Sequence, residues 1–492
     1  MFEYTIITST VEFSEDRINV LKKSYSEMSI LDDNYSEISE VFWGGHLLLL
    51  ARHRFDYQGQ PFHRMGNNFI ALIGWLVNDK FKESSKNNFI SQLYGRILGN
   101  KKQDWLIDSI GEYQIITGDE DSINIVTNIV QTHPVYYSNN SFGTCISNRA
   151  SLANIINPYN NDYDVNANLE LIAFDNILDN KTLYNNVSML KRNCDLYLTR
   201  HHLCSPIVNK SSYPMEYYGS LNAVDAMEDL SSWLVNQLKL LPKQVKLDKE
   251  NFFGLSGGKD SRLLLLLLKK SDLFDYYSGV TTHGYHASGE VLSAENIVKH
   301  YGLNHQVNEQ TNMYLNPLNY YFDHVFDHIF QMEGEIGSRS LHGNHHLYRK
   351  TLLTGHEAGL RESLSASFEV SDFNSLYKYV DNEFPLDPFS IIKVSKIQQM
   401  RDTVKSILNE SYQNGVATEN LLNWYSIIGR GSRWVGKLTS MSSPRGLYAN
   451  IFCSNRVTLT ANALGIKNSV ASEPSFKTSL VVSTYLLSSR IL

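Results

Sequence analysis

Hydrophobic and polar positions follow two different periods along the chain. Up to about residue 198 the apolar runs are short, rich in β-branched and aromatic residues, and separated by turn residues. This pattern is typical of strands. It predicts a β-rich N-terminal half, with strands at Glu3–Ser9, Asn68–Val77, Tyr113–Thr117, Ile123–Val130 and Gly143–Ser147.

The second part of the chain has a helical period broken by short apolar runs. Between Thr199 and Tyr218 the chain loses periodicity, and Asn222 to Leu240 then places its apolar residues on one helical face. Strands and helices alternate after that, and the last part, beyond about Phe384, has mostly helical patterns. The expected strands are Asn251–Leu255, Asp275–Val280 and Thr351–Thr354, and the expected helices are Arg262–Lys270 and Ser288–Tyr301. Such alternation predicts parallel strands with a nucleotide site at their carboxyl ends.

The length of 492 residues favours two domains. The predicted boundaries are 1–205 for the N-terminal domain, 206–221 for a linker and 222–492 for the C-terminal domain. A formal net charge of -7, with acidic and basic residues mixed along the chain, argues against a nucleic-acid partner. The longest apolar run, Leu263 to Leu268, is too short to span a bilayer, and Met1 to Tyr4 shows no secretion signal. We therefore expect a cytoplasmic protein without a membrane partner.

The cysteines of the chain are scattered, at Cys145, Cys194, Cys204 and Cys453, and form no CxxC pair. Reduced structural thiols are the expected state, in preference to disulfides or a zinc site.

The motif Ser256-Gly257-Gly258-Lys259-Asp260-Ser261 lies where a predicted strand passes into a predicted helix. Its glycines allow backbone angles and close approaches that a Cβ would forbid, and N–H groups of such a turn converge on one point beside a helix N-terminus. The two serines can donate to phosphate oxygens, and Asp260 suits Mg²⁺. The spacing excludes a Walker A motif, because only three residues separate Gly254 from Gly258. The motif predicts a PP-loop, which binds ATP for cleavage to AMP and pyrophosphate.

With these residues the chain resembles the asparagine synthetase-like family, which includes β-lactam synthetases and lasso-peptide macrolactam cyclases. The segment Gly254 to Ser261 is similar to the family's synthetase signature, and Val280 to Gly284 falls where the second strand meets adenine. Ser288-Gly289-Glu290, Ala294 and His305 continue the similarity. The resemblance implies an α/β protein, with an N-terminal Ntn-type αββα sandwich and a C-terminal PP-loop domain of Rossmann-like, HUP type that ends in helices. It implies that ATP contacts Leu255, Ser256, Gly257, Gly258, Asp260, Ser261, Val280 and Gly355, and that Asp260 holds Mg²⁺.

The N-terminal half resembles the family's glutaminase domain in altered form. The landmarks occur in the family's order: His53-Arg54, Gly59-Gln60-Pro61, Ala71 to Asn78, Gly111-Glu112-Tyr113, His133 to Tyr137 and Ile146-Ser147. An active glutaminase of this family has a cysteine directly after Met1, whereas this chain has Phe2. Without that nucleophile glutamine cannot be hydrolysed, so we expect a scaffold or a substrate-docking surface.

A second departure lies at Gly359 and Leu360, where relatives carry an Asp-Glu pair whose Asp helps to hold Mg²⁺. Glu357 and Glu362 are the candidates to replace it. His356 occupies the place of a residue near the reacting acyl group, where a neutral imidazole can deprotonate an amine; a structural histidine is the alternative. Arg430, Arg433, Trp434 and Lys437 form a basic-aromatic cluster. In such synthetases cationic side chains neutralise charge on the α-phosphate and pyrophosphate. The candidates for the lysine among them are Lys437, Lys467 and Lys477, and for each of these an exposed basic helix face is the alternative. The catalytic candidates are His356, Glu357, Arg430 and Lys437.

The resemblance implies an ATP-dependent C–N ligase that adenylates a carboxylate and joins it to an amine. Without a glutaminase, the amine belongs to the substrate itself or to a second substrate. This favours macrolactam or lactam formation in a peptide or specialised metabolite, with a precursor peptide as one candidate substrate and other biosynthetic proteins as candidate partners. The alternatives are amidation by free ammonia and a nucleotide-binding protein without catalysis. Thiolation of tRNA is disfavoured because no cysteine lies near the loop.

Overall fold

We analysed a computed structural model of the chain, which describes residues 2–29, 35–53, 61–81, 89–99, 104–157, 163–174, 177–210, 223–245, 251–277, 279–283, 289–308, 333, 351–355, 372–384, 392–430, 432–433, 436 and 447–463. The described strands form three sheets. Two antiparallel sheets belong to the N-terminal half and one parallel sheet to the C-terminal half. Within the described part of the chain, none of the helices has the length and apolar character needed to cross a membrane.

The two N-terminal sheets have six strands each. The first sheet runs in the order β10 (Ser188–Met189), β8 (Tyr136–Asn140), β9 (Gly143–Ser147), β1 (Phe2–Thr8), β3 (Leu47–His53) and β2 (Ser36–Phe42). The second sheet runs in the order β12 (Ile207–Lys210), β11 (Cys194–Thr199), β7 (Ser122–Thr127), β6 (Ile110–Gly118), β5 (Asn68–Val77) and β4 (Phe62–Met65). The five strands that the hydrophobic pattern predicted in this half are all present, within a few residues of the expected bounds.

Alternating side chains place these sheets face to face. In β1, Ile6 belongs to the core between the sheets, whereas Ile7 points to the outer face of the first sheet. That outer face is covered by helix α1 (Glu15–Met28) and the short helix α3 (Ala150–Ala153). The outer face of the second sheet is covered by α2 (Phe89–Gly99). The order of layers is helix, sheet, sheet, helix, so the predicted αββα sandwich is confirmed.

The parallel sheet has the order β15 (His305–Asn308), β14 (Gly279–His283), β13 (Asn251–Gly254), β16 (Thr351–Thr354) and β17 (Leu447–Asn450). Helices α5 (Ala223–Gln244), α6 (Lys259–Lys270) and α7 (Gly289–Tyr301) contribute to its core. The remaining described helices are α4 (Val165–Phe174), α10 (Phe373–Glu383), α11 (Val394–Gln413), α12 (Leu421–Arg430) and α14 (Asn455–Ala463). This order, with parallel strands and flanking helices, confirms the Rossmann-like C-terminal fold and its helical last part.

One predicted strand is displaced. The segment Asp275–Val280 was expected to be a strand, but a 3-10 helix covers Phe274–Tyr276 and the strand starts at Gly279. The ring of Phe274 stacks on Phe253 with centroids 6.4 Å apart, and Tyr277 meets Phe253 edge-on at 5.9 Å. The apolar residues that suggested a strand therefore pack on β13 from a turn.

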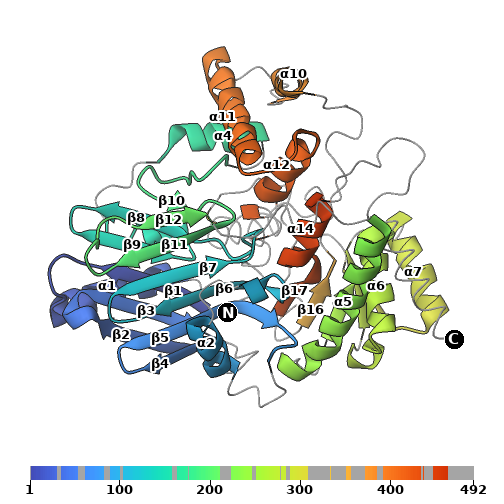
Figure 1. The fold of residues 1–492 in the computed structure, drawn as a ribbon, viewed down its shortest axis with the longest axis horizontal. Coiled ribbons are helices and arrows are strands. Elements are labelled where there is room, and N and C mark those ends of the chain that lie inside the picture. Colours follow the sequence, from blue (N-terminus) through green and yellow to red (C-terminus); the bar gives the residue numbers. More distant parts are fainter. Residues whose placement is uncertain are drawn as a thin grey trace.

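The two halves share cores and a polar interface. Figure 1 shows α14, β16 and β17 between the N-terminal sheets and helices α5 to α7. One core cluster joins Trp75, Val77 and Ile110 of the N-terminal half to residues of α5 and α6. The buried Gln244 side chain accepts a hydrogen bond from the N–H of Asn78 at 3.1 Å and donates to its carbonyl oxygen at 2.8 Å. The strand β12 extends the N-terminal sheet into the predicted linker, and the boundaries of the domains stay a prediction.

Glu112 is a further polar link between the halves. It lies in β6 with 0% of its surface exposed, and its carboxylate accepts a 2.7 Å hydrogen bond from the N–H of Asn450 at the end of β17.

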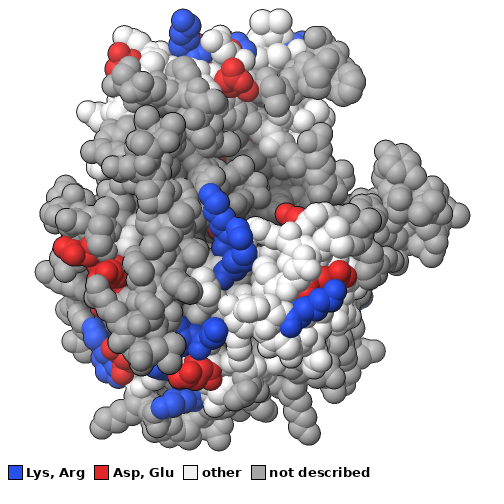
Figure 2. Space-filling view, turned by 90° about the vertical axis from the view of Figure 1, so that its right-hand side faces the viewer, with Lys and Arg blue, Asp and Glu red and all other residues white. Residues whose placement is uncertain are grey.

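Acidic and basic side chains are interspersed on the described part of the face shown in Figure 2.

Candidate functional site

The PP-loop motif lies at the carboxyl end of the parallel sheet. Strand β13 ends at Gly254, and α6 begins at Lys259. The sheet order reverses at β13, because β14 lies on one side of it and β16 on the other. In open parallel sheets such a reversal opens the crevice in which ligands bind. The sequence motif therefore occupies the position that the fold offers to a nucleotide.

Two serine hydroxyls hold the loop in its turn. The Oγ of Ser261 accepts from the N–H of Ser256 at 3.0 Å and lies 3.1 Å from the carbonyl oxygens of both Ser256 and Gly258. The N–H of Gly258 donates to the Oγ of Ser256 at 3.1 Å. These contacts tie the strand end to the first helical turn. Contact of the two serines with phosphate oxygens stays a prediction.

At Gly257 and Gly355 neighbouring atoms lie so close to the backbone that a side chain would not fit without a shift. A Cβ on Gly257 would lie 3.1 Å from the Cβ of Ser293 in α7. A Cβ on Gly355, directly after β16, would lie 3.0 Å from the carbonyl oxygen of Asp260. The structure thus brings Gly355, predicted from the resemblance, into contact with the PP-loop helix. Side chains at either position would displace the loop.

The helix start is suited to an anion and a cation together. Gly258 is the N-cap of α6 and has no side chain that could cap it, so its geometry is that of a helix N-terminus which accepts phosphate. Asp260 lies in the first turn, where a carboxylate is stabilised by the helix dipole and where it could share a Mg²⁺ with a phosphate chain. The donor set fits a metal–nucleotide complex, with the metal polarising the phosphates.

Two of the predicted ATP contacts have buried side chains. Leu255 is 2% exposed and Val280 is fully buried, and both belong to the core of the C-terminal half. Their side chains anchor the loop and the strand β14 beside it. A contact of either residue with ATP stays a prediction.

The catalytic candidates fall largely outside the described residues. His356, Glu357 and Lys437 lie outside them, as do Gly359 and Leu360. Arg430 is the last residue of α12. Their roles stay predictions.

Arg433, a member of the predicted basic-aromatic cluster, is a buried residue. It has 0% of its surface exposed. Its Nη2 donates to the carbonyl oxygens of Asp179, at 3.1 Å, and Lys181 in the N-terminal half. Arg433 therefore packs on the N-terminal half, and a catalytic role of the cluster stays a prediction.

The N-terminal half contains a buried histidine, His133. His133 is 5% exposed, and a Cβ on Gly74, which has a φ of +86°, would lie 2.5 Å from its Nε2. Burial lowers the pKa of His133 to about 4. At neutral pH the ring is therefore uncharged and packed tightly against the backbone of β5.

This lowered pKa predicts a pH-dependent loss of stability. Between the ordinary pKa of 6.5 and about 4 the unfolded chain binds a proton that the folded chain does not, so the free energy of unfolding falls as pH falls. At pH 4 the protonation of His133 in the unfolded chain lowers the free energy of unfolding by about 3 kcal/mol relative to neutral pH. We expect His133→Gln to lack this part of the slope when urea unfolding is compared at pH 7, 5.5 and 4.5.

The comparison of wild type with His133→Gln reports the titration of His133 alone. Burial raises the pKa of Asp195 to about 7, which gives a slope of opposite sign, but Asp195 is present in both proteins and cancels in the difference. Equal slopes in wild type and His133→Gln would contradict the assignment.

Several charged residues of the domain interface were not predicted from the sequence. Arg192, Arg149 and Glu333 have no motif around them, and their burial arises from residues far apart in the chain. Glu112 was quoted only as a landmark of the resemblance.

Comparison with known proteins gives remote structural similarities. No protein-family model and no curated protein matches the sequence. Among solved structures, the chain is similar to glutamine phosphoribosylpyrophosphate amidotransferase from B. subtilis complexed with ADP and GMP, with 10% identity over 62% of this chain and 65% of that chain and a TM-score of 0.28. The chain thus spans just under two thirds of that protein. NH3-dependent NAD synthetase from Campylobacter jejuni matches with 12% identity over 44% of this chain and 97% of that chain, at a TM-score of 0.20.

A third structure is the glutamine-dependent NAD+ synthetase from Acinetobacter baumannii in complex with ADP. It has 13% identity over 54% of this chain and 58% of that chain, with a TM-score of 0.20. Identities and TM-scores this low do not decide the function of this chain, which we infer from its own residues.

Proposed function

We propose that the chain is an ATP-dependent C–N ligase that forms AMP. The observation that supports this most is the Ser256–Ser261 loop at the reversal point of the parallel sheet, with Gly355 of the neighbouring strand in contact with Asp260. A substrate carboxylate would attack the α-phosphorus of ATP, and the bond to pyrophosphate would break. An amine would then attack the acyl carbon, lose a proton and release AMP.

The thiol chemistry supports an amine source other than glutamine. All four cysteines are free, as predicted, and Cys145, Cys194 and Cys453 are buried. Burial raises the pKa of Cys194 to about 11 and that of the other two still further. Since the thiolate is the nucleophile, these three thiols are poorly suited to hydrolyse glutamine. The amine would then belong to the substrate, which favours macrolactam or lactam formation in a peptide or specialised metabolite.

The reaction is testable by its products. Purified protein with Mg²⁺, ATP and a pool of peptides carrying a free carboxylate and a free amine is expected to release AMP and pyrophosphate. Release of ADP in place of AMP would contradict the proposal. Product formation only after ammonium is added would favour ammonia-dependent amidation, and tight ATP binding without turnover on the identified substrate would favour a non-catalytic protein.

Asp260→Asn tests the role of the loop in the same assay. Removal of a direct metal ligand should lower the rate of AMP release by at least the roughly 10- to 100-fold known for groups that only orient metal ligands. Asp272→Asn is a matched control, because Asp272 is exposed beyond the other end of α6 with a φ of 57°, which Asn tolerates. Equal rates for both variants would exclude Asp260 as a ligand.

A further inference from the structure

The segment 450–455 joins β17 to α14, and its polar groups are bonded to the N-terminal half. Every residue of the segment has 0% of its surface exposed. The hydrogen bonds, of 2.7 to 3.3 Å, join Asn450 to Glu112, Cys453 to Asn128, Ser454 to Gly111, and Asn455 to Ile129 and Tyr113. The N-terminal half therefore fixes the conformation of the chain that follows the last strand of the parallel sheet.

Glu112 is the charged residue among these partners. Its Oε2 accepts a hydrogen bond from the N–H of Asn450 at 2.7 Å and another from the Nε1 of Trp75 at 3.4 Å. A buried N–H that loses its acceptor is strongly unfavourable. We therefore expect Asn450 to change position if the carboxylate of Glu112 is removed.

The position of Asn450 is connected to the PP-loop through two contacts. Asn450 pairs with Thr354 at the end of β16, directly before Gly355. The Oδ1 of Asn450 also accepts from the N–H of Phe452 at 3.0 Å. A Cβ on Gly355 would lie 3.3 Å from the ring of Phe452 and 3.0 Å from the carbonyl oxygen of Asp260. Gly355 thus lies between the segment 450–455 and the first turn of α6.

We propose that Glu112 is a positioning residue for the ATP site, which fixes the segment 450–455 and through it the PP-loop. The inference rests on the proposed function, since it takes the PP-loop as the ATP site. It gives the N-terminal half a part in ATP binding that requires no catalysis by that half.

Glu112→Met tests this inference, with Gln244→Met as the matched control. Methionine is similar in length to both side chains and is only a weak acceptor. Gln244 also joins the two halves, through buried hydrogen bonds to Asn78 and Phe81, but it does so from the last residue of α5, before β13. Both variants are therefore expected to melt below wild type.

Fluorescence titration of the full chain with Mg·ATP, well below the melting temperatures, separates the two variants. Under these conditions a loss of stability alone leaves the dissociation constant unchanged, because nearly all of the protein is folded. We expect Glu112→Met to raise the dissociation constant roughly 2- to 30-fold. Gln244→Met should keep the wild-type value.

Two more variants decide the question even if Glu112→Met does not fold. Glu112→Gln keeps a carbonyl oxygen for Asn450 and Trp75, because a single oxygen of Glu112 accepts from both, and should bind Mg·ATP as wild type does. Phe452→Leu shortens the side chain that lies against Gly355 and should raise the dissociation constant at least about twofold.

The inference is wrong if wild type has the same dissociation constant as Glu112→Met or Phe452→Leu. It is also wrong if Gln244→Met or Glu112→Gln weakens binding as much as Glu112→Met does. In each of these outcomes wild type still binds Mg·ATP, so the proposed function is unaffected. A wild type that does not bind Mg·ATP would overturn the inference and the proposed function together.

Discussion

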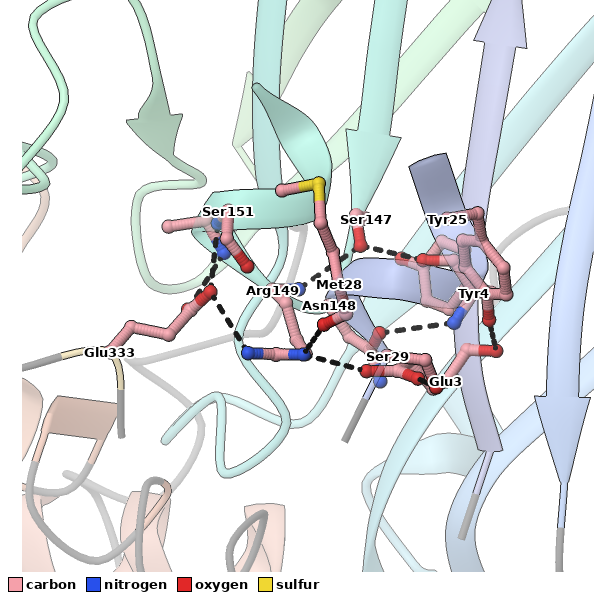
Figure 3. Close-up of polar contacts among 11 residues, drawn as sticks. Glu3, Tyr4, Tyr25, Met28, Ser29, Ser147, Asn148, Arg149, Ser151 and Glu333 are labelled. Carbon is pink, nitrogen blue, oxygen red and sulfur yellow. Dashed lines mark hydrogen bonds and ion pairs between the residues drawn. The ribbon is translucent and has the colours of Figure 1, made fainter. Parts of the chain in front are cut away.

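Arg149→Met is expected to lower the free energy of unfolding by about 3–5 kcal/mol, the range for removing one partner of a buried ion pair. Figure 3 shows Arg149 between Glu3 of β1 and Glu333. Its Nη1 lies 3.0 Å from Glu3 and its Nη2 lies 3.6 Å from Glu333, and the three side chains are 9%, 0% and 5% exposed. The variant would leave two carboxylates buried without their shared cation.

The electrostatics of the triad support a large effect. Burial by itself would lower the pKa of Arg149, but the carboxylates of Glu333 and Glu3 outweigh it and hold the pKa above its ordinary value. Glu333 also accepts hydrogen bonds from the N–H groups of Ala150, at 2.9 Å, and Ser151, at 2.8 Å. The triad therefore joins the first N-terminal sheet to a residue of the other half, and its loss should weaken the contact between them.

Urea unfolding followed by tryptophan fluorescence measures this effect. Arg200→Met, at an exposed site, is the control and should stay within about 0.5 kcal/mol of wild type. Adding Glu3→Gln and Glu333→Gln to Arg149→Met should recover part of the loss, because uncharged amides remove the unpaired charges and the amide oxygen of Glu333→Gln keeps an acceptor for one of the two N–H groups of Ala150 and Ser151. A loss below about 1 kcal/mol in the single variant would show that water reaches the triad.

Local hydrophobic patterns in the sequence predicted most of the helices and strands. The helical period of α5 and α7 was sufficient because each helix keeps one exposed face. Strand β5 was predictable from its continuous apolar run, since both of its faces are buried. The pattern failed at Asp275–Val280, where apolar rings pack from a turn, and it did not predict β17, whose four residues are all buried and show no alternation. These errors arise where tertiary packing, and not period, decides the conformation.

The candidate site could be predicted from the sequence only where its residues are adjacent along the chain. Six adjacent residues form the PP-loop, so their order alone identified it, and the contact of Gly355 with Asp260 followed from the resemblance. Arg192 donates to Ser432 across about half the chain, and Glu112 reaches Asn450 across the two halves. No window of sequence contains such pairs, so their burial could be found only from the fold.

The interface also connects the N-terminal half to the PP-loop. Glu112 holds the N–H of Asn450, Asn450 pairs with Thr354 at the end of β16, and the next residue along β16 is Gly355. Gly355 in turn lies against both Asp260 and the ring of Phe452. A continuous set of contacts therefore runs from the N-terminal sheet to the PP-loop helix, and the choice between a scaffold and a substrate-docking surface stays a prediction.

Gly355→Val is expected to lower the affinity for Mg·ATP by about tenfold to a hundredfold. A Cβ at this position would lie 3.0 Å from the carbonyl oxygen of Asp260 and 3.3 Å from the ring of Phe452, and valine adds two methyl groups beyond it. Overpacking of this kind costs about 1–3 kcal/mol, and each 1.4 kcal/mol corresponds to about a tenfold change in affinity. The strain falls on the first turn of α6, where displacement of Ser261 would open its contact with Ser256.

Fluorescence titration with Mg·ATP measures the affinity, and thermal melts establish that the variant is folded. Gly254→Ala is the matched control at the end of the adjacent strand, because its Cβ would meet only the carbonyl oxygen of Leu353 at 3.9 Å. The control should bind ATP as wild type does, and Gly355→Ala should fall between the two. If Gly355→Val binds ATP with unchanged affinity, the nucleotide does not depend on the contact between β16 and the PP-loop, and the ATP site must lie elsewhere on the sheet.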